Sequence, residues 1–172
     1  MTTSSMDRTL ILLRHANAES GAADHDRDLT SDGWKDARAA GAWLHTHDLG
    51  ADEVLCSTAE RTRQTTQALW EGGCCETDVR YEERIYNARP EALLEVVRDS
   101  DEDASVVMVV GHAPGIPAFT SLLADGEGSP QAHELLAQGF PTTSMAILTF
   151  AGHWRDLAFG AARLDRFHIA RA

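Results

Sequence analysis

Two histidines and two arginines occupy the positions in this sequence that are best suited to do chemistry. Arg14 and His15 directly follow a run of apolar residues, and His112 closely follows a second such run. Arg61 falls in the first turn of a segment that we expect to be helical. Each side chain therefore stands where a predicted strand ends or a predicted helix begins, which is where the loops of an α/β sheet bring ligand-binding groups together.

Arginine at these positions indicates an anionic ligand. The guanidinium groups of Arg14 and Arg61 offer planar sets of donors, and helix N-termini add backbone amides, so the implied ligand is a compact oxyanion such as phosphate. A cation in the first turn of a helix lies at the unfavourable end of the helix dipole, at a cost of about 0.3–1 kcal/mol. A bound anion would explain Arg61, and so would an ion pair with Glu60 or with an exposed acid.

The two histidines indicate nucleophilic chemistry. Nearby positive charge disfavours the imidazolium form, so we expect a neutral His15 that attacks phosphorus through one ring nitrogen while the other donates to a backbone carbonyl. His112 would bind a phosphoryl oxygen and stabilise the transition state. Taken singly, each histidine could instead be a hydrogen-bonded residue at a strand end. The two together favour the catalytic interpretation.

Apolar runs and capping residues give the expected order of the elements. We expect strands at 9–13, 53–56 and 105–110, and helices from Thr30 or Ser31 to about His47, from Ser57-Thr58-Ala59-Glu60 to about Trp70, and from Pro90 and Pro114. A glycine-rich loop is expected at 125–129. Residues 144–150 and 154–160 are expected to form an antiparallel hairpin that turns near 151–153.

This order predicts an α/β fold. Strands that alternate with helices favour three α/β/α layers around a mostly parallel central sheet, here with an antiparallel hairpin at its edge. The length suits a single domain, which we place at residues 8–172 after a flexible N-terminal tail at 1–7. Because the carboxyl ends of parallel strands share one edge of the sheet, the two arginines and two histidines are expected to converge there.

Composition limits the partners and the location. The formal net charge is −12, whereas binding to nucleic acid or to an anionic membrane surface needs an excess of Lys and Arg. The apolar run Leu10–Leu13 is too short for a signal peptide or a membrane span, so we expect a cytoplasmic protein. The three cysteines have no C-x-x-C spacing and are expected to be reduced and structural.

No metal or other cofactor is expected. His45 and His47 are two residues apart on a predicted helix and would point to different faces, which makes them a poor pair of metal ligands. Imidazole groups near a helix C-terminus are better explained by the helix dipole.

Three blocks of sequence carry a resemblance to a known family. LLRHA at 12–16, CSTAERTRQT at 56–65 and VVGHAPGI at 109–116 resemble the histidine phosphatase superfamily, which is phosphoglycerate-mutase-like in fold. The blocks DHDRDLTSDGWKDA at 24–37 and FPTTSMAILTF at 140–150 are similar to its SixA-like phosphohistidine phosphatase subgroup. The resemblance implies that His15 is the phosphorylated nucleophile and that Arg14, Arg61 and His112 form the phosphate pocket.

The sequence departs from the family pattern at two points. Ala16 replaces the usual glycine after the histidine, a change from one small residue to another that has a different backbone preference. The sequence shows no clear match to the glutamate block of the family's mutases and ester phosphatases. Glu83 is therefore the candidate general acid by its position, and Glu82 is the second candidate. Both could instead be solvated surface acids.

Two further segments have open interpretations. The segment 24–28 could border the pocket, with Arg27 helping to hold the substrate, or could be a solvated turn, which we slightly favour. Thr142 and Thr143 resemble a subgroup position near the phosphate, although threonines before a strand are ordinary.

These features lead to three functional hypotheses. The leading one is a metal-independent phosphatase that works through phospho-His15 on protein phosphohistidine, because a pocket with an uncertain acid suits a substrate whose leaving group is imidazole. The second keeps the chemistry but assigns a small phosphomonoester as substrate. The third is a non-catalytic module that binds phosphate or a phosphoprotein. The expected partner is thus a phosphorylated protein or a small phosphorylated molecule.

Overall fold

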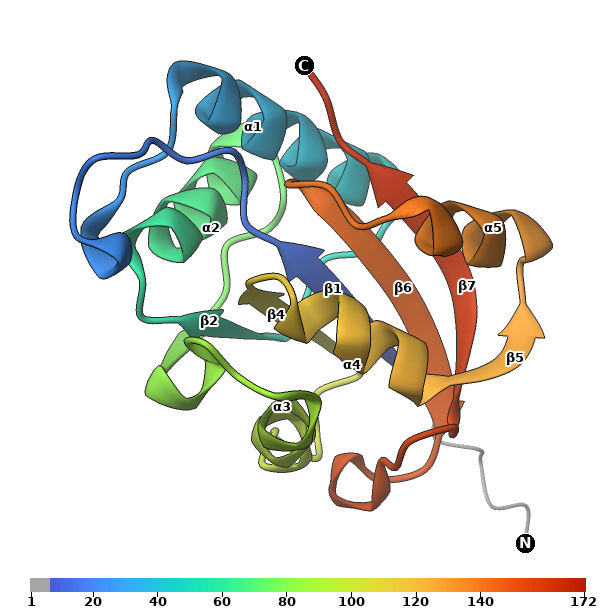
Figure 1. Ribbon diagram of the computed structural model, residues 1–172. Helices are drawn as coiled ribbons and strands as arrows, with labels where there is room; N and C mark the ends of the chain where they lie inside the picture. Colours follow the sequence, from blue (N-terminus) through green and yellow to red (C-terminus); the bar gives the residue numbers. More distant parts are fainter. Residues whose placement is uncertain (1–6) are drawn as a thin grey trace, which may run out of the picture.

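One mixed β-sheet organises the chain (Figure 1). The computed structural model describes residues 7–172, and all but the last residue of the predicted tail at 1–7 lies outside the described residues. Within this range the strands are β1 (Asp7–Arg14), β2 (Glu53–Ser57), β3 (Val79–Glu82), β4 (Val106–Gly111), β5 (Ala124–Gly128), β6 (Ser144–Ala151) and β7 (Ala162–Ile169). Asp7 therefore belongs to the sheet rather than to the predicted tail.

The sheet has the strand order β3-β2-β4-β1-β6-β7-β5. Strands β3, β2, β4 and β1 are mutually parallel, β6 runs antiparallel to both β1 and β7, and β5 is parallel to β7. The carboxyl ends of β1, β2 and β4 consequently lie at the same edge of the sheet. This is the edge at which the sequence predicts the site.

Helices cover both faces of the sheet (Figure 1). They are α1 (Ser31–Thr46), α2 (Glu60–Gly72), α3 (Pro90–Arg98), α4 (Gly115–Leu123) and α5 (Pro130–Gln138), with short 3-10 turns η1 (Asp24–Asp26), η2 (Glu83–Ile85) and η3 (Trp154–Asp156). Helices α1 and α2 pack on one face, and α3, α4 and α5 pack on the other. The predicted three-layer α/β/α fold is confirmed.

Alternate residues of β1 belong to two separate apolar cores. Leu10 and Leu12 pack with residues of α3, α4 and α5, whereas Ile11 and Leu13 pack with α1 and α2. All four side chains are fully buried. A strand buried on both faces needs an apolar residue at every position, which is why this run shows no alternation with polar residues.

The second strand of the predicted hairpin is placed wrongly. Residues 154–160 contain the turn η3, and the strand antiparallel to β6 is β7. Trp154 is fully buried, and its indole N–H donates to the carbonyl of Ala104 at 2.7 Å, so this aromatic residue is a core anchor rather than part of a strand. The hairpin also does not form the edge of the sheet, because β5, within the predicted glycine-rich loop, pairs outside β7.

One of the two predicted helix caps is confirmed. The side chain of Thr30 accepts a hydrogen bond from the backbone N–H of Gly33 and caps α1. The capping box from Ser57 is wrong, because the N-cap of α2 is Ala59 and no side chain caps this helix. Ser57 is the last residue of β2 and contributes to the site instead.

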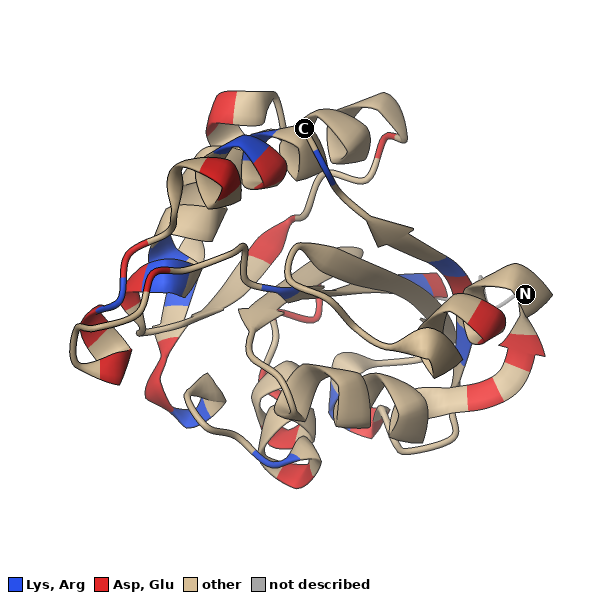
Figure 2. Ribbon diagram, turned by 45° about the horizontal axis from the view of Figure 1, so that its top comes forward, with Lys and Arg blue, Asp and Glu red and all other residues tan. Residues whose placement is uncertain are grey.

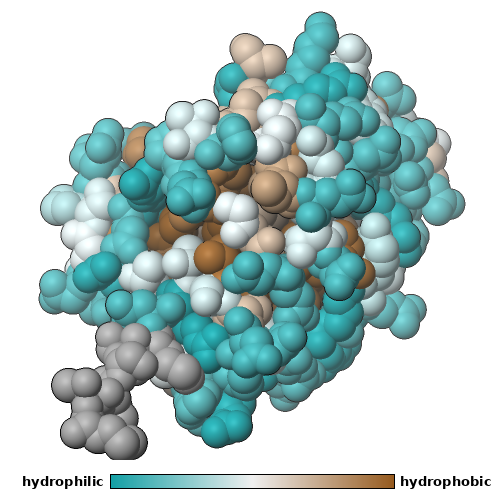
Figure 3. Space-filling model, turned by 180° about the vertical axis from the view of Figure 1, so that it is seen from behind, coloured by the Kyte–Doolittle hydropathy of each residue, from teal (hydrophilic) through white to brown (hydrophobic). Residues whose placement is uncertain are grey.

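The surface is mostly polar. Figure 2 shows acidic residues spread over several helices and over β5, in keeping with the net charge of −12. The face seen in Figure 3 is mainly hydrophilic, with its most hydrophobic residues gathered toward the middle. Among residues 7–172, no helix combines the length and the apolar composition that crossing a bilayer requires.

Candidate active site

The fold brings the two predicted histidines together at the carboxyl edge of the sheet. His15 follows β1, His112 follows β4, and their ring centroids are 5.3 Å apart. Arg14 ends β1, and Arg61 lies in the first turn of α2, where both act electrostatically on His15. The predicted convergence of these four residues is therefore confirmed, while their roles in catalysis stay predictions.

His15 is held with one ring nitrogen available. Its side chain is buried, and Nδ1 lies 2.7 Å from the backbone carbonyl oxygen of Ala16, so Nδ1 carries the proton and donates it. The N–H of Ala16 in turn donates to Thr65 Oγ1 at 3.0 Å, which ties this loop to α2. Nε2 of His15 is then the unprotonated nitrogen and can act as a nucleophile.

Burial keeps His15 neutral. Desolvation, aided by the positive charges of Arg61 and Arg14, lowers the pKa of His15 to about 4, although its hydrogen bond to Ala16 opposes the shift. The expected neutral imidazole is thus the form present at physiological pH. Burial is the larger cause of the lowered pKa of His15, whereas the prediction from the sequence invokes the neighbouring positive charges.

Ser57 fixes the orientation of His112. His112 is buried, and its Nε2 lies 2.8 Å from Ser57 Oγ, which also accepts the backbone N–H of Ala59 at 3.3 Å. Because Nδ1 of His112 is buried with no acceptor in residues 7–172, we assign the imidazole proton to Nδ1 and let the Ser57 hydroxyl donate to Nε2. Burial, together with the unfavourable interactions of a protonated His112 with His15 and Arg61, lowers the pKa of His112 to about 3. His112 is consequently a neutral donor through Nδ1.

Several buried donors of the site have no partner in the protein. Arg14 donates through Nη1 to the carbonyl of Phe140 at 2.8 Å, and Arg61 donates through Nη1 to the carbonyl of Asp24 at 2.6 Å. Arg14 Nε, Arg61 Nε and His112 Nδ1 are buried and form no hydrogen bond within residues 7–172. Because unsatisfied buried donors are costly, their presence around one nucleophile indicates an anion-binding site.

Asp24 and Tyr86 join the site without having been predicted. The Asp24 carboxylate accepts hydrogen bonds from Arg61 Nη2 at 3.2 Å and from the Tyr86 hydroxyl, and the Tyr86 ring meets the His112 ring edge-on at 5.5 Å. The bond from Tyr86, followed by those from Arg27 and Arg61, lowers the pKa of Asp24 to about 2. The segment 24–28 is thus an exposed turn, as one interpretation has it, and it also contacts Arg61 of the site through Asp24. That Arg27 helps to hold the substrate stays a prediction.

Sequence spacing gives little signal for these contacts. Asp24 and Arg61 are 37 residues apart, and Asp24 and Tyr86 are 62 residues apart. The alternative explanation for Arg61 is an ion pair with an exposed acid. Arg61 does form such a pair, and its partner is Asp24, a residue that the sequence does not single out for this role.

Comparison with known proteins agrees with this geometry. The model of the histidine phosphatase superfamily (branch 1) matches residues 10–88. An uncharacterized protein of Mycobacterium tuberculosis is 40% identical over 162 residues, covering 92% of this chain and 100% of that protein. The chain belongs to the histidine phosphatase superfamily.

Two solved structures of the superfamily resemble the chain over nearly its whole length. A candidate phosphohistidine phosphatase SixA from Nakamurella multipartitia is 42% identical, with a TM-score of 0.86 over 96% of this chain and 98% of that chain. A candidate phosphohistidine phosphatase SixA from Agrobacterium tumefaciens is 32% identical, with a TM-score of 0.76 over 94% and 97% of the two chains. The phosphoglycerate-mutase-like fold is thereby confirmed.

Neither candidate acid makes a hydrogen bond or ion pair with the four predicted site residues within residues 7–172, although Glu82 pairs with Ser57 in the β2–β3 register. Glu83 is exposed, and within residues 7–172 its carboxylate forms no hydrogen bond or ion pair. Glu82 pairs with Arg84 Nε at 2.7 Å. Glu83 stays a prediction as the general acid, and Asp24, with its low pKa, is ionised and cannot donate a proton near neutral pH.

Ala16 and Thr143 complete the surroundings of His15. Ala16 is fully buried and is not among the residues with positive φ, so alanine replaces the family's glycine without backbone strain. Thr143 has φ +59, and its N–H lies 3.1 Å from the carbonyl oxygens of both Arg14 and His15. This buried threonine holds the backbone that carries the nucleophile.

Proposed function

We propose that this chain is a metal-independent protein phosphohistidine phosphatase that works through phospho-His15. The single observation that carries the proposal is the neutral His15 imidazole next to buried donors from Arg14, Arg61 and His112 that no atom of the described residues satisfies. The similarity to the two SixA structures supports protein phosphohistidine as the substrate. The partner is then a phosphorylated protein.

In the first step, Nε2 of His15 attacks the phosphorus of the substrate. A bond forms between Nε2 and phosphorus while the substrate's N–P bond breaks, and its electron pair goes to the departing imidazole nitrogen. If the substrate imidazole is protonated on its other nitrogen, it leaves as a neutral molecule without a general acid. Arg14, Arg61 and His112 donate hydrogen bonds to the phosphoryl oxygens as charge redistributes.

In the second step, water attacks the phosphorus of phospho-His15. The P–N bond breaks, its electron pair returns to Nε2, and the proton lost by water passes to phosphate or solvent. The proton on Nδ1, held by the carbonyl of Ala16, stays in place throughout, so His15 leaves phosphorus as a neutral imidazole. The same hydrogen bond therefore serves both steps.

The acids around the site favour an N–P substrate over a phosphoester. Expelling an alkoxide benefits from a general acid, typically by about 10²- to 10⁴-fold. Glu83 is exposed without a polar contact in the described range, and Asp24 is ionised. Imidazole, with a conjugate acid of pKa ~6.5, needs less assistance.

A cytoplasmic location remains a prediction from the sequence.

The test is the intact mass of the enzyme after rapid alkaline quench, because alkali preserves phosphohistidine. The enzyme is mixed with a phosphohistidine protein, and wild type is compared with His15→Ala. A transient phosphoryl adduct on wild type alone is the expected result. A folded His15→Ala protein with normal phosphate release would falsify the proposal. A strong preference of the wild type for one phosphorylated metabolite would mean that the substrate is that metabolite and not protein phosphohistidine.

A further inference from the structure

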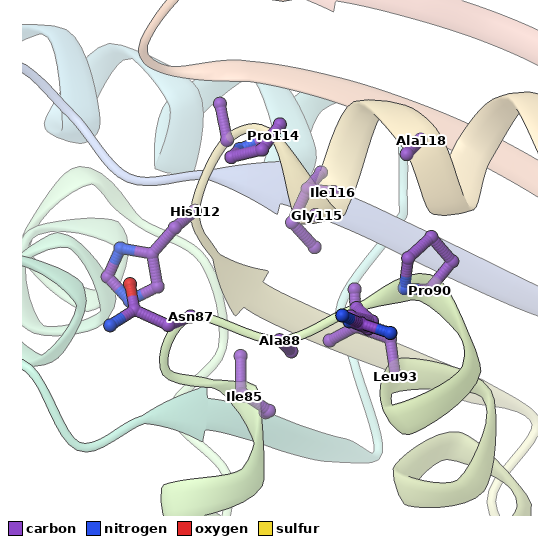
Figure 4. Close-up of a pocket in the computed structure, with 12 residues that line it drawn as sticks. Ile85, Asn87, Ala88, Pro90, Leu93, His112, Pro114, Gly115, Ile116 and Ala118 are labelled. Atoms are coloured by element: carbon purple, nitrogen blue, oxygen red, sulfur yellow. The ribbon is translucent and has the colours of Figure 1, made fainter.

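A pocket of about 290 Å³ opens beside the proposed catalytic centre, and the two chemical steps make no use of it. It lies between the segment 85–93 and the start of α4. In Figure 4, His112 and Asn87 lie at one end, and Pro90 and Ala118 lie at the other. The lining is mainly apolar and includes Ile85, Ala88, Pro90, Leu93, Pro114 and Ile116.

Glycine residues allow close packing between the elements that line this pocket. A Cβ atom on Gly115 would lie 2.6 Å from the carbonyl oxygen of Ala88, so only glycine lets the start of α4 approach the opposite wall this closely. A Cβ on Gly111 would lie 3.0 Å from Ile116 and 3.2 Å from Ile85. The start of α4 and the segment around Ala88, which both line the pocket, thus pack directly against each other.

The rim of the pocket carries an unpaired positive charge. Arg89 lines the pocket, is exposed, and has no side-chain hydrogen bond or ion pair within the part of the chain that the structure describes. Most arginines of this acidic protein do have such partners, as Arg84 does with Glu82 and Asp99. An apolar cavity with a free cation at its rim suits a ligand that has one apolar and one anionic group.

We propose that this pocket binds an apolar side chain, about the size of leucine, from the segment of the substrate protein that flanks the phosphohistidine. Arg89 pairs with a carboxylate of the same segment. The inference rests on the proposed function and adds a specificity determinant to it. A volume of about 290 Å³ gives ample room for a leucine side chain and lies just below the roughly 300–1,000 Å³ of small-molecule sites. The choice of a peptide side chain therefore rests on the exposed Arg89 and on the position beside His112, and the test below includes a small molecule.

The position of the pocket links it to the reaction. His112 contributes to both the pocket and the phosphate site, so a side chain in the pocket lies next to the group that holds the phosphoryl oxygens. Burying a leucine rather than an alanine then strengthens binding of the substrate protein. We expect about a ten-fold higher kcat/KM, mainly through KM.

The experiment uses phosphohistidine peptides in which one leucine is moved through the flanking positions, against all-alanine peptides, each with one glutamate. Phosphoramidate is the minimal N–P substrate, since it has no side chain. Ala118→Met fills the end of the pocket far from His112, and Ser121→Met is the matched control because Ser121 is exposed on the same helix outside the pocket.

We expect the wild type to prefer leucine at one flanking position. Ala118→Met should abolish this preference and Ser121→Met should keep it, while both variants turn over phosphoramidate within about two-fold of the wild-type rate. Arg89→Gln should lower kcat/KM for the peptide with glutamate several-fold without changing phosphoramidate turnover. If wild type cleaves the peptides without any preference for leucine, or if Ala118→Met keeps that preference, the pocket is not the subsite.

Failure of the proposed function would look different. A folded wild-type enzyme that cleaves neither phosphoramidate nor any phosphohistidine peptide would overturn both proposals. If Ala118→Met instead impairs only an aryl phosphate ester, the occupant is a small molecule and the assignment to a peptide side chain is wrong.

Discussion

Asp24 holds Arg61 at two points. Arg61 donates through Nη1 to the backbone carbonyl of Asp24 at 2.6 Å and through Nη2 to its carboxylate at 3.2 Å. The carbonyl contact positions the guanidinium group. The carboxylate is itself an anion beside the proposed phosphate site, so it competes with a phosphoryl group for Arg61 and repels it.

Asp24→Asn should therefore strengthen binding of inorganic phosphate. The variant keeps the backbone contact to Arg61 but removes the negative charge, and an exposed ion pair of about 0.2–1 kcal/mol corresponds to a gain of up to about five-fold. Calorimetric titration with phosphate measures the effect. The matched control is Asp26→Asn, in the same turn, and weaker phosphate binding by Asp24→Asn alone would show that the carboxylate mainly positions Arg61.

Stability should fall as the pH decreases below about 6.5. Burial lowers the pKa of His15 to about 4 and that of His112 to about 3, whereas both titrate near 6.5 in the unfolded chain. Between these values the unfolded state binds more protons than the folded state, so each histidine lowers the free energy of unfolding as protons are added.

Urea unfolding at pH 7 and at pH 5 measures this dependence. The double variant His15→Gln with His112→Gln should lose less stability between the two pH values than the wild type, by at least about 1 kcal/mol. A variant of the exposed His45 to Gln should behave like the wild type. Equal pH dependence in all three proteins would contradict the assignment of neutral, buried histidines.

The packing of α1 against α2 should be intolerant of a single methyl group. A Cβ atom on Gly41 would lie 2.2 Å from the carbonyl oxygen of Leu69, so Gly41→Ala must separate the two helices. We expect a loss of about 1–3 kcal/mol despite the higher helix propensity of alanine. Gly50→Ala is the control, because a Cβ atom on Gly50 would lie 3.8 Å from its nearest neighbour, Cys75 Cβ. Thermal unfolding of both variants measures the difference in stability.

The sequence predicts those parts of the fold that depend on local pattern. A continuous apolar run identifies β1, because both of its faces are buried. Thr30 identifies the start of α1 because a cap acts within one helical turn. The four site residues were found since each lies where such an element ends or begins.

Contacts between distant segments could not be predicted. The bonds from Arg61 and Tyr86 to Asp24 join the first turn of α2 to the segments around η1 and η2, and nothing in the spacing of these residues indicates that the three segments meet. The prediction of a strand at 154–160 fails because Trp154 and Leu157 are buried in the core from a turn rather than from the sheet. Ser57 was interpreted as a cap because serine at a strand–helix junction fits both roles.

Ser57→Ala tests the role of that serine as a positioning residue. Without the hydroxyl, nothing holds the proton of His112 on Nδ1, and the imidazole can present an acceptor to the phosphoryl oxygens instead of a donor. We expect kcat to fall by about ten-fold, and the free energy of unfolding to fall by about 1–3 kcal/mol because Nε2 of His112 loses its buried partner. Ser57→Thr, which keeps the hydroxyl, should recover most of the activity.

A buried serine away from the site provides the comparison. Ser100 is buried, and its hydroxyl has no hydrogen-bond partner within residues 7–172, so Ser100→Ala removes the same atom without touching His112. Single-turnover phosphorylation of His15 by phosphoramidate separates the two cases, because only Ser57→Ala should slow this step. Equal rates in both variants would mean that His112 keeps its donor nitrogen without Ser57, and that the buried imidazole is oriented by packing against His15 and Tyr86 alone.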